Sequence, residues 1–270
     1  MTTLDSRSLL VNDVIRQTAQ GAELIVDLGH PFFFDHPLDH IPGLLLIEAG
    51  LQLAQQRAAP GQFVTSIDAR FLKYALFNDP VILSTTTADH VTVVTLTQND
   101  LPRATITVET AVYATPARQG PETVPEGLHP CEAAPLGKHH PENVLISTPQ
   151  IQGSQISAWI LPGRDDCPLT DTCQVIHPLH MLEAFMQVQR YINSQRLDKS
   201  RMRDILTGVS FRQDAPVQDL DLALQINGST EFTETGRSRL SRDAVITRGG
   251  HNFAHCALHT VLAGRAAAKD

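Results

Sequence analysis

One helical segment has almost no polar face, and this feature limits most strongly what the chain can fold into. Between residues 44 and 54 the apolar side chains point in nearly every direction around a helical axis; they are Leu44, Leu45, Leu46, Ile47, Ala49, Leu51, Leu53 and Ala54. A helix that is apolar on most sides must be buried on most sides. The rest of the chain must therefore supply a structure that encloses it.

The segments around this helix predict how it begins, ends and is covered. We expect a helix over 41–58, with Asp39 as the N-cap and Pro42 in the first turn, where its missing N–H would have no partner anyway. Four runs rich in Val, Ile, Thr and Phe follow, at 63–77, 81–88, 91–98 and 104–113. A long antiparallel sheet that curls around the helix would bury it on most sides.

The same order of elements occurs twice, which indicates an internal duplication. A second helical pattern spans 176–193, and its Glu183-Ala184 pair aligns with Glu48-Ala49 of the first. Candidate strands follow it at 205–212, 221–226, 229–235, 241–247 and 253–261. We therefore predict an α+β fold of two halves, in which each of two central helices is wrapped by an antiparallel β-sheet. Pairing the halves side by side would remove an open sheet edge.

A Pro-rich, polar segment separates the two halves. It has no helical or strand periodicity and contains Pro116, Pro121, Pro125, Pro130, Pro135 and Pro141. We predict a first domain over 1–114, an interdomain linker over 115–141 and a second domain over 142–270.

Charge and composition exclude several classes of protein. The chain has 270 residues, with 29 acidic against 21 basic residues and a net charge of −8, so a nucleic-acid partner is not expected. No window approaches the ~20 apolar residues of a membrane span, and no signal-peptide core is evident, so we expect a cytoplasmic protein without a membrane partner. The spacing of the four cysteines fits neither a zinc site nor a disulfide framework.

Residues 30–49 carry the most specific motif of the chain, which reads HPFFFDHPLDHIPGLLLIEA. Its Asp35-His36-Pro37, Asp39-His40-Ile41-Pro42-Gly43 and Glu48-Ala49 elements resemble the signature of the A-factor biosynthesis family. The resemblance implies two fused hotdog domains and an enzyme of γ-butyrolactone signal biosynthesis, a branch of secondary metabolism. Such an acyltransferase moves a β-ketoacyl group from a carrier-protein or coenzyme A thioester to dihydroxyacetone phosphate.

The residue types of the motif suit this reaction. His36 or His40 could accept the hydroxyl proton, because a neutral histidine has an ordinary pKa near 6.5. Glu48 is the candidate to orient the histidine or the hydroxyl, since a buried glutamate is rare unless it has a partner. The first-turn N–H groups around Gly43 and Leu44 could bind the oxyanion. Because only the first helix carries the full motif, we expect one site per chain and a minor role for Glu183.

Other basic residues and histidines lie outside the motif. Arg70 and Lys73, with Arg212 at the corresponding place of the second half, are candidates for a phosphate contact. His251, His255 and His259 recur every four residues, but on a strand neighbouring members would be ~13 Å apart, too far to share a metal ion. We expect no metal and no organic cofactor.

Two alternatives to acyl transfer remain open from the sequence. One is a hotdog thioesterase or hydroxyacyl dehydratase, although a dehydratase would have its histidine fourteen residues before the glutamate, where this chain has Phe34. The other is a non-catalytic acyl-binding protein. Association of whole chains into a homo-oligomer is also open.

Overall fold

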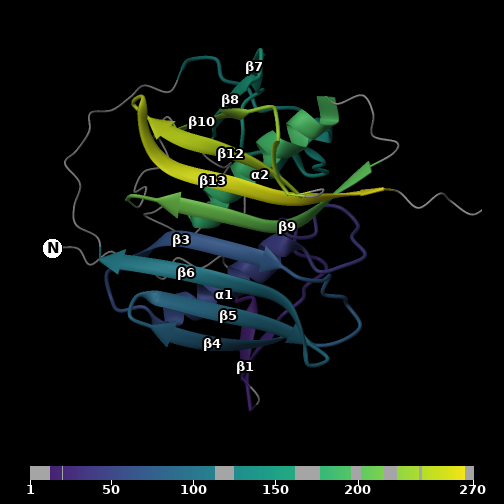
Figure 1. Cartoon of the computed structure of the whole chain (residues 1–270), viewed down its shortest axis with the longest axis vertical. Helices are drawn as coiled ribbons and strands as arrows, with labels where there is room; N and C mark the ends of the chain where they lie inside the picture. The colour runs from purple at the N-terminus through teal and green to yellow at the C-terminus, as the bar shows by residue number, and fades with distance from the viewer. Residues whose placement is uncertain are drawn as a thin grey trace, which may run out of the picture.

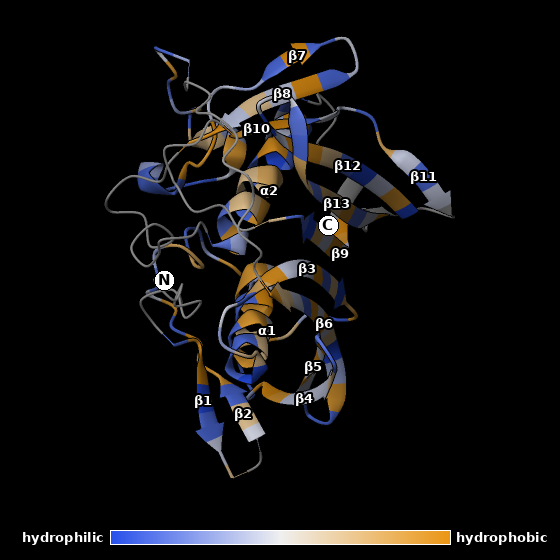
Figure 2. Cartoon of the chain, turned by 90° about the vertical axis from the view of Figure 1, so that its left-hand side faces the viewer, coloured by the Kyte–Doolittle hydropathy of each residue, from blue (hydrophilic) through white to orange (hydrophobic). Residues whose placement is uncertain are grey.

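The computed structural model describes most of the chain, namely residues 13–19, 21–112, 125–161, 177–195, 202–215, 224–236 and 239–264. Two long helices, α1 (Gly43–Arg57) and α2 (Pro178–Gln195), pack on one face of a single antiparallel sheet, as Figures 1 and 2 show. The strands of the first half are β1 (Ile15–Thr18), β2 (Gly21–Leu24), β3 (Gln62–Phe71), β4 (Ile82–Ala88), β5 (Val91–Gln98) and β6 (Leu101–Val112). Those of the second half are β7 (Gln150–Gln152), β8 (Gln155–Ile160), β9 (Met202–Gln213), β10 (Leu224–Ser229), β11 (Thr233–Gly236), β12 (Arg239–Arg248) and β13 (His251–Gly264).

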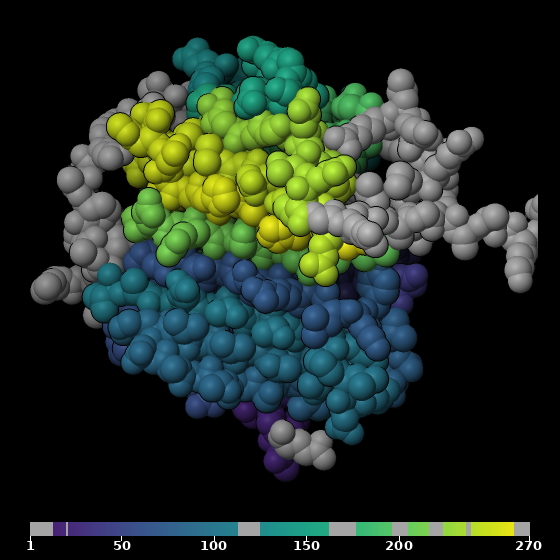
Figure 3. Space-filling view, viewed as in Figure 1, coloured from purple at the N-terminus to yellow at the C-terminus, as the bar shows by residue number. Residues whose placement is uncertain are grey.

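The two halves are joined through the middle of this sheet. The strand order is β1-β2-β4-β5-β6-β3-β9-β13-β12-β10-β8-β7, with β11 paired to β12. Strands β3 and β9 pair in a register that runs from Ser66 opposite Arg212 to Arg70 opposite Gly208. The outer face of the sheet, which faces the viewer in Figure 3, therefore continues from one half to the other. This pairing confirms the predicted α+β arrangement and removes a sheet edge from each half.

Helix α1 is enclosed as its sequence predicts. All ten residues from Leu45 to Ala54 are buried, and Gly50 lets the helix lie so close to β6 that a Cβ there would be 2.9 Å from the Cβ of Ile106. The helix begins at Gly43 with Pro42 as its N-cap, without a side-chain hydrogen bond. The prediction of Asp39 as the N-cap is wrong, because the Asp39 carboxylate instead contacts His40.

The duplication is visible in matching hydrogen bonds on the two helices. On α1, Gln52 donates to Glu48 Oε1 at 2.9 Å and accepts from the Val14 N–H at 3.0 Å. On α2, Gln187 donates to Glu183 Oε1 at 3.2 Å and accepts from the Leu145 N–H at 2.9 Å. Each glutamine lies one helical turn after its glutamate and ties its own helix to the segment that precedes it.

The nine strands predicted from the sequence are all present, with shifted ends, whereas β1, β2, β7 and β8 were not predicted. Residues 125–141 of the predicted linker are mostly exposed but are held by three buried side chains, those of Cys131, Leu136 and Lys138, and Leu136 belongs to a short 3-10 helix, Ala134–Leu136. The domain limits themselves remain a proposal, and residues 113–124 lie outside the described residues. In the described parts of the chain, no helix is long and apolar enough to cross a membrane.

Candidate functional site

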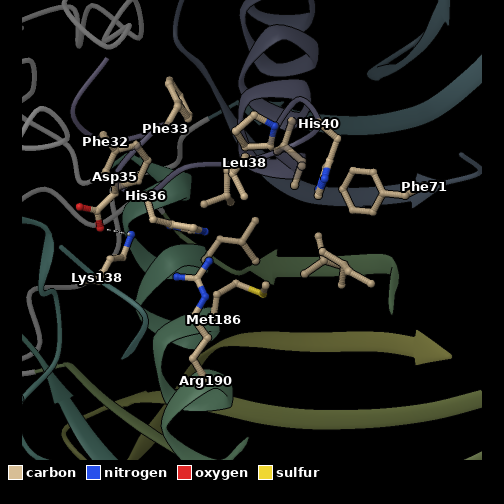
Figure 4. Close-up of a pocket in the computed structure, with 17 residues that line it drawn as sticks. Phe32, Phe33, Asp35, His36, Leu38, His40, Phe71, Lys138, Met186 and Arg190 are labelled. Carbon is tan, nitrogen blue, oxygen red and sulfur yellow. Dashed lines mark ion pairs between the residues drawn. The ribbon is translucent and has the colours of Figure 1, made fainter. Parts of the chain in front are cut away.

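A cavity of about 150 Å³ lies where the two halves meet, beside the N-terminus of α1 (Figure 4). The first half contributes the loop before α1, the first residues of α1 and the end of β3: Phe32, Phe33, Asp35, His36, Leu38, His40, Pro42, Gly43, Leu44, Ile47 and Phe71. The second half contributes α2 and β9 through Leu182, Met186, Arg190, Leu206 and Val209, and Lys138 completes the wall. The lining thus combines apolar side chains with a few charged groups from distant parts of the chain.

His36 lines this cavity and has a lowered pKa. It lines the cavity from the loop before α1, and its side chain points toward the same space as that of Arg190 in Figure 4. Its pKa is lowered from the ordinary value by burial and by the positive charges of Arg190 and Lys138, against a smaller opposing effect of Asp35. His36 is therefore neutral near pH 7, as a general base must be.

His40 also lines the cavity, but its environment is different. Its Nδ1 lies 2.6 Å from Asp39 Oδ1, and its ring lies against that of Tyr74 with centroids 4.3 Å apart. The Asp39 side chain is 91% exposed, so the pair sits at the rim of the cavity. His40 is thus held by two neighbours, while His36 has a buried Nδ1 without a hydrogen-bond partner among the described residues.

Asp35 fixes the segment that brings Lys138 to the cavity. Its Oδ1 accepts hydrogen bonds from the backbone N–H groups of His139 and His140, at 3.2 and 2.8 Å, and its Oδ2 lies 3.6 Å from Lys138 Nζ. Nearby, the Asn143 side chain donates to the Pro31 carbonyl at 2.7 Å. The aspartate of the Asp-His-Pro motif therefore organises the wall of the site, in a segment that we predicted to be a linker.

Glu183 is the ionised carboxylate behind the cavity. Its Oε1 lies 2.9 Å from Lys138 Nζ and 2.8 Å from Arg190 Nη1, and its side chain is completely buried. Burial alone would raise its pKa, but the charges of Arg190 and Lys138 and the hydrogen bonds from Lys138 and Gln187 outweigh burial and lower the pKa to about 2. The expectation of a minor role for Glu183 is therefore at odds with its contacts, since it holds both cations of the cavity wall.

Glu48 lies outside the cavity lining and contacts neither His36 nor His40 through any described hydrogen bond. Its Oε1 accepts from Gln52, and its Oε2 lies 3.5 Å from Nε2 of His177, which comes from the other half. Burial raises the pKa of Glu48 to about 7 and lowers that of His177 to about 4. The raised pKa of Glu48 and the lowered pKa of His177 both favour the uncharged forms of these side chains. Glu48 therefore lies in the buried core between the two halves.

The start of α1 supplies backbone donors at the cavity. Gly43 and Leu44 both line it, and the N–H groups of a first helical turn have no acceptor within the helix. The backbone at Gly43 is also closely approached, because a Cβ at this position would lie 3.0 Å from Cζ of Phe71. Gly43 and Leu44 therefore both lie at the cavity, and the binding of an oxyanion by their amides stays a prediction.

The three predicted phosphate contacts do not reach this cavity. Arg70, Lys73 and Arg212 are exposed, and none of them lines it. Arg70 instead contacts Asp68 at 3.1 Å on the outer face of the sheet. His251, His255 and His259 lie on β13, and the described residues contain no cluster of metal-ligand side chains. Cys131 and Cys256 are buried free thiols; Cys167 and Cys173 lie outside the described residues.

Sequence reasoning missed three charged residues at the site. Arg190 follows Glu183 by seven residues, which is two helical turns, so their shared face on α2 could have been recognised. Lys138 lies in a segment without periodicity, and Asp35 belongs to the motif but gave no sign of its partner more than a hundred residues away. Only the folded chain brings these groups together.

Comparison with known proteins gives matches to the first half of the chain. Residues 4–115 match the family model of the A-factor biosynthesis hotdog domain. The match covers 112 of the 270 residues, so the first half of the chain is similar to this family. A 64-residue segment is 45% identical to a 2-oxo-3-(phosphooxy)propyl 3-oxoalkanoate synthase of Streptomyces coelicolor, covering 23% of this chain and 20% of that protein. A 77-residue segment is 38% identical to the protein of the same name from Streptomyces virginiae, covering 27% and 26%. The matches thus span about a fifth to a quarter of these relatives.

Solved structures extend the likeness of fold to both halves. The dehydratase domain from the CurJ module of the curacin polyketide synthase aligns with a TM-score of 0.63 at 13% identity, covering 95% of this chain and 96% of that chain. A hotdog-fold protein of unknown function from Alicyclobacillus acidocaldarius gives a TM-score of 0.61 at 12% identity, covering 93% and 96%. These identities carry information on fold alone, and they confirm the double hotdog architecture.

Proposed function

We propose that the protein is an acyltransferase that moves a β-ketoacyl group from a thioester to a hydroxyl of dihydroxyacetone phosphate. The observation that carries this proposal is that a neutral His36 and a cationic Arg190 face one cavity beside the first turn of α1. The name of the Streptomyces relatives describes a 3-oxoalkanoate ester of a three-carbon phosphorylated ketone, which is the product of this transfer. Because the matches cover only part of those proteins, their activity comes to this chain as a proposal.

The first part of the mechanism concerns the acceptor. Arg190 is 32% exposed and uses Nη1 for Glu183, so the remaining guanidinium N–H groups are offered to the phosphate of the acceptor. With the phosphate there, the free hydroxyl would lie near His36. The hydroxyl oxygen attacks the thioester carbonyl carbon and a C–O bond forms, while its proton passes to a ring nitrogen of His36.

The second part concerns the donor. The amides of Gly43 and Leu44 would stabilise the oxyanion of the tetrahedral intermediate. As this collapses, the C–S bond breaks and the leaving thiolate takes the proton from the His36 imidazolium. Apolar side chains such as Leu182, Met186 and Val209 would surround the acyl chain. No step requires a metal ion or an organic cofactor.

The donor would be a carrier-protein or coenzyme A thioester, and the cytoplasm is the proposed location because both substrates are intracellular metabolites. The test is thiol release from a β-ketoacyl thioester with and without dihydroxyacetone phosphate. We expect release only with the acceptor. Equal release without it would indicate a thioesterase, water loss from a hydroxyacyl thioester would indicate a dehydratase, and tight binding without turnover would indicate an acyl-binding protein.

A further inference from the structure

A second, larger hollow of about 510 Å³ lies on the outer face of the sheet, where β3, β9 and β13 meet β12. Figure 3 shows this face, with the strands of the two halves meeting across its middle. The proposed acyl transfer makes no use of it. Its size is in the range of small-molecule sites in proteins, and its polar lining includes Arg70, Arg239 and His259.

The register of three strands explains why a hollow forms there. Gly208 of β9 stands directly opposite Arg70 of β3 on one side and His259 of β13 on the other. Residues directly opposite one another point to the same face of a sheet. Because the central position of this row has no side chain, the hollow lies over Gly208 between Arg70 and His259, and the His259 Cδ2 is 3.6 Å from the place that a Cβ of residue 208 would take. Gly208 is also required by the backbone, since a Cβ there would lie 2.9 Å from the Ala69 carbonyl oxygen.

The hollow meets the inner cavity at one corner of the sheet. Phe71, the last residue of β3, lines both of them. On the neighbouring strand, Leu206 lines the inner cavity and Thr207 lines the outer hollow. The pairing of β3 with β9 ends at Gly208, so no ladder hydrogen bonds join the two strands beyond it. The two spaces therefore approach each other at this corner, beyond the last paired residues of β3 and β9.

We propose that the outer hollow binds the phosphate of a 4′-phosphopantetheine arm, whose thioester end reaches the inner cavity past Phe71. This inference rests on the proposed acyl transfer and names where its donor binds. Arg70 and Arg239 supply the positive charge, and His259 adds a ring N–H donor, while Asp68 keeps Arg70 in place through its 3.1 Å contact. The phosphopantetheine phosphate is common to coenzyme A and to a carrier protein, so either source fits the hollow.

The test compares binding of 4′-phosphopantetheine with that of pantetheine, which lacks the phosphate, by calorimetry on the full chain. We expect the wild type to bind the phosphorylated form at least about fivefold more tightly, and R70Q, R239Q and the charge-adding H259E to lose this preference. K73Q, which alters an exposed lysine outside the hollow, is the matched control and should keep it. Equal affinity for the two compounds in the wild type, or an unchanged preference in all three variants, would overturn the inference.

A kinetic comparison separates this inference from the proposed function and distinguishes the two sources. With a β-ketoacyl N-acetylcysteamine thioester, which has no phosphate, R70Q should transfer as fast as the wild type. Its KM should rise about five- to tenfold for the coenzyme A or the carrier-protein thioester, whichever is the natural donor. Transfer from all donors with unchanged KM in R70Q would contradict the outer site and leave the function standing, whereas no transfer to dihydroxyacetone phosphate from any donor would contradict the function itself.

Discussion

Lys138 Nζ lies 2.9 Å from Glu183 Oε1, and both side chains are buried. Through its second contact, with Asp35, Lys138 connects the motif loop of the first half to helix α2 of the second. The cavity between the halves therefore depends on a buried network of charges whose members are far apart in the chain.

Replacement of Glu183 by Gln should destabilise the protein strongly, because Lys138 and Arg190 would keep their charges and lose their anionic partner. Removing one partner of a buried ion pair typically costs about 3 to 5 kcal/mol in the free energy of unfolding. Glu48→Gln is the matched control: it alters the equivalent residue of α1, whose raised pKa favours the uncharged form, so its cost should be below about 1 kcal/mol. Chemical denaturation measures both, and equal losses would contradict the assignment of the charged network to α2.

The same network predicts how stability depends on pH. The pKa of Glu183 is about 2 in the folded protein against an ordinary value of 4.5, so its contribution is complete above pH 4.5 and is lost as pH falls toward 2. Burial lowers the pKa values of His177 and His180 to about 4, so these residues add a loss of folding stability that begins as pH falls below 6.5. The difference in unfolding free energy between wild type and Glu183→Gln should therefore shrink from pH 5 to pH 3. A difference that stays constant over this range would contradict the lowered pKa.

His36 is predicted to be the base, so His36→Asn should lower kcat by about 10² to 10⁴ with little change in thioester affinity. In the wild type kcat should rise with pH and level off, with its midpoint below 6.5 because burial and two nearby cations lower the pKa of His36. His40→Asn is the control at the cavity rim and should cost less. A larger loss of kcat in His40→Asn than in His36→Asn would indicate that His40 is the base.

Arg190 is predicted to bind the acceptor phosphate. Arg190→Lys keeps the charge but loses the planar pair of donors, so KM for dihydroxyacetone phosphate should rise about tenfold, with a smaller change in KM for the thioester. Dihydroxyacetone, which has no phosphate, is the control substrate and should be used equally poorly by both proteins. If KM instead rises mainly for the thioester, Arg190 contacts the donor and not the acceptor.

Gly50 tests the packing of α1 on the sheet. Alanine is the better helix former by about 1 kcal/mol, but its Cβ would lie 2.9 Å from two atoms of Ile106. Gly50→Ala should therefore lower the free energy of unfolding by about 1 to 3 kcal/mol. Gln56→Ala, at an exposed position of the same helix, should change it by less than about 0.5 kcal/mol.

The sequence predicts the layout of this fold because its signals are local. The pattern from Leu44 to Ala54, which is apolar on all sides of the helix, requires an enclosing sheet. Most strands of both halves show either alternating apolar and polar residues or a continuous apolar run that is long enough to be recognised. Of the four missed strands, β1, β2 and β7 have only three or four residues each, too few to show a period, whereas β8 has six and its alternation was overlooked.

The site could be predicted only in part. His36, His40, Gly43 and Leu44 are close in sequence and reach one cavity. The network of Asp35, Lys138, Glu183 and Arg190 depends on contacts between segments far apart in the chain, which no local pattern encodes. Glu48 was predicted to be catalytic because it is buried, yet burial alone does not distinguish a carboxyl at a cavity from one held between two halves of a core.

The most direct test of the account is a crystal structure of the protein with dihydroxyacetone phosphate and a non-reactive β-ketoacyl thioester analogue. We predict the phosphate within hydrogen-bond distance of Arg190, the free hydroxyl near His36 and the carbonyl oxygen at the amides of Gly43 and Leu44. Density for the acceptor away from this cavity, or beside Glu48 and His177, would contradict a single site shared between the halves.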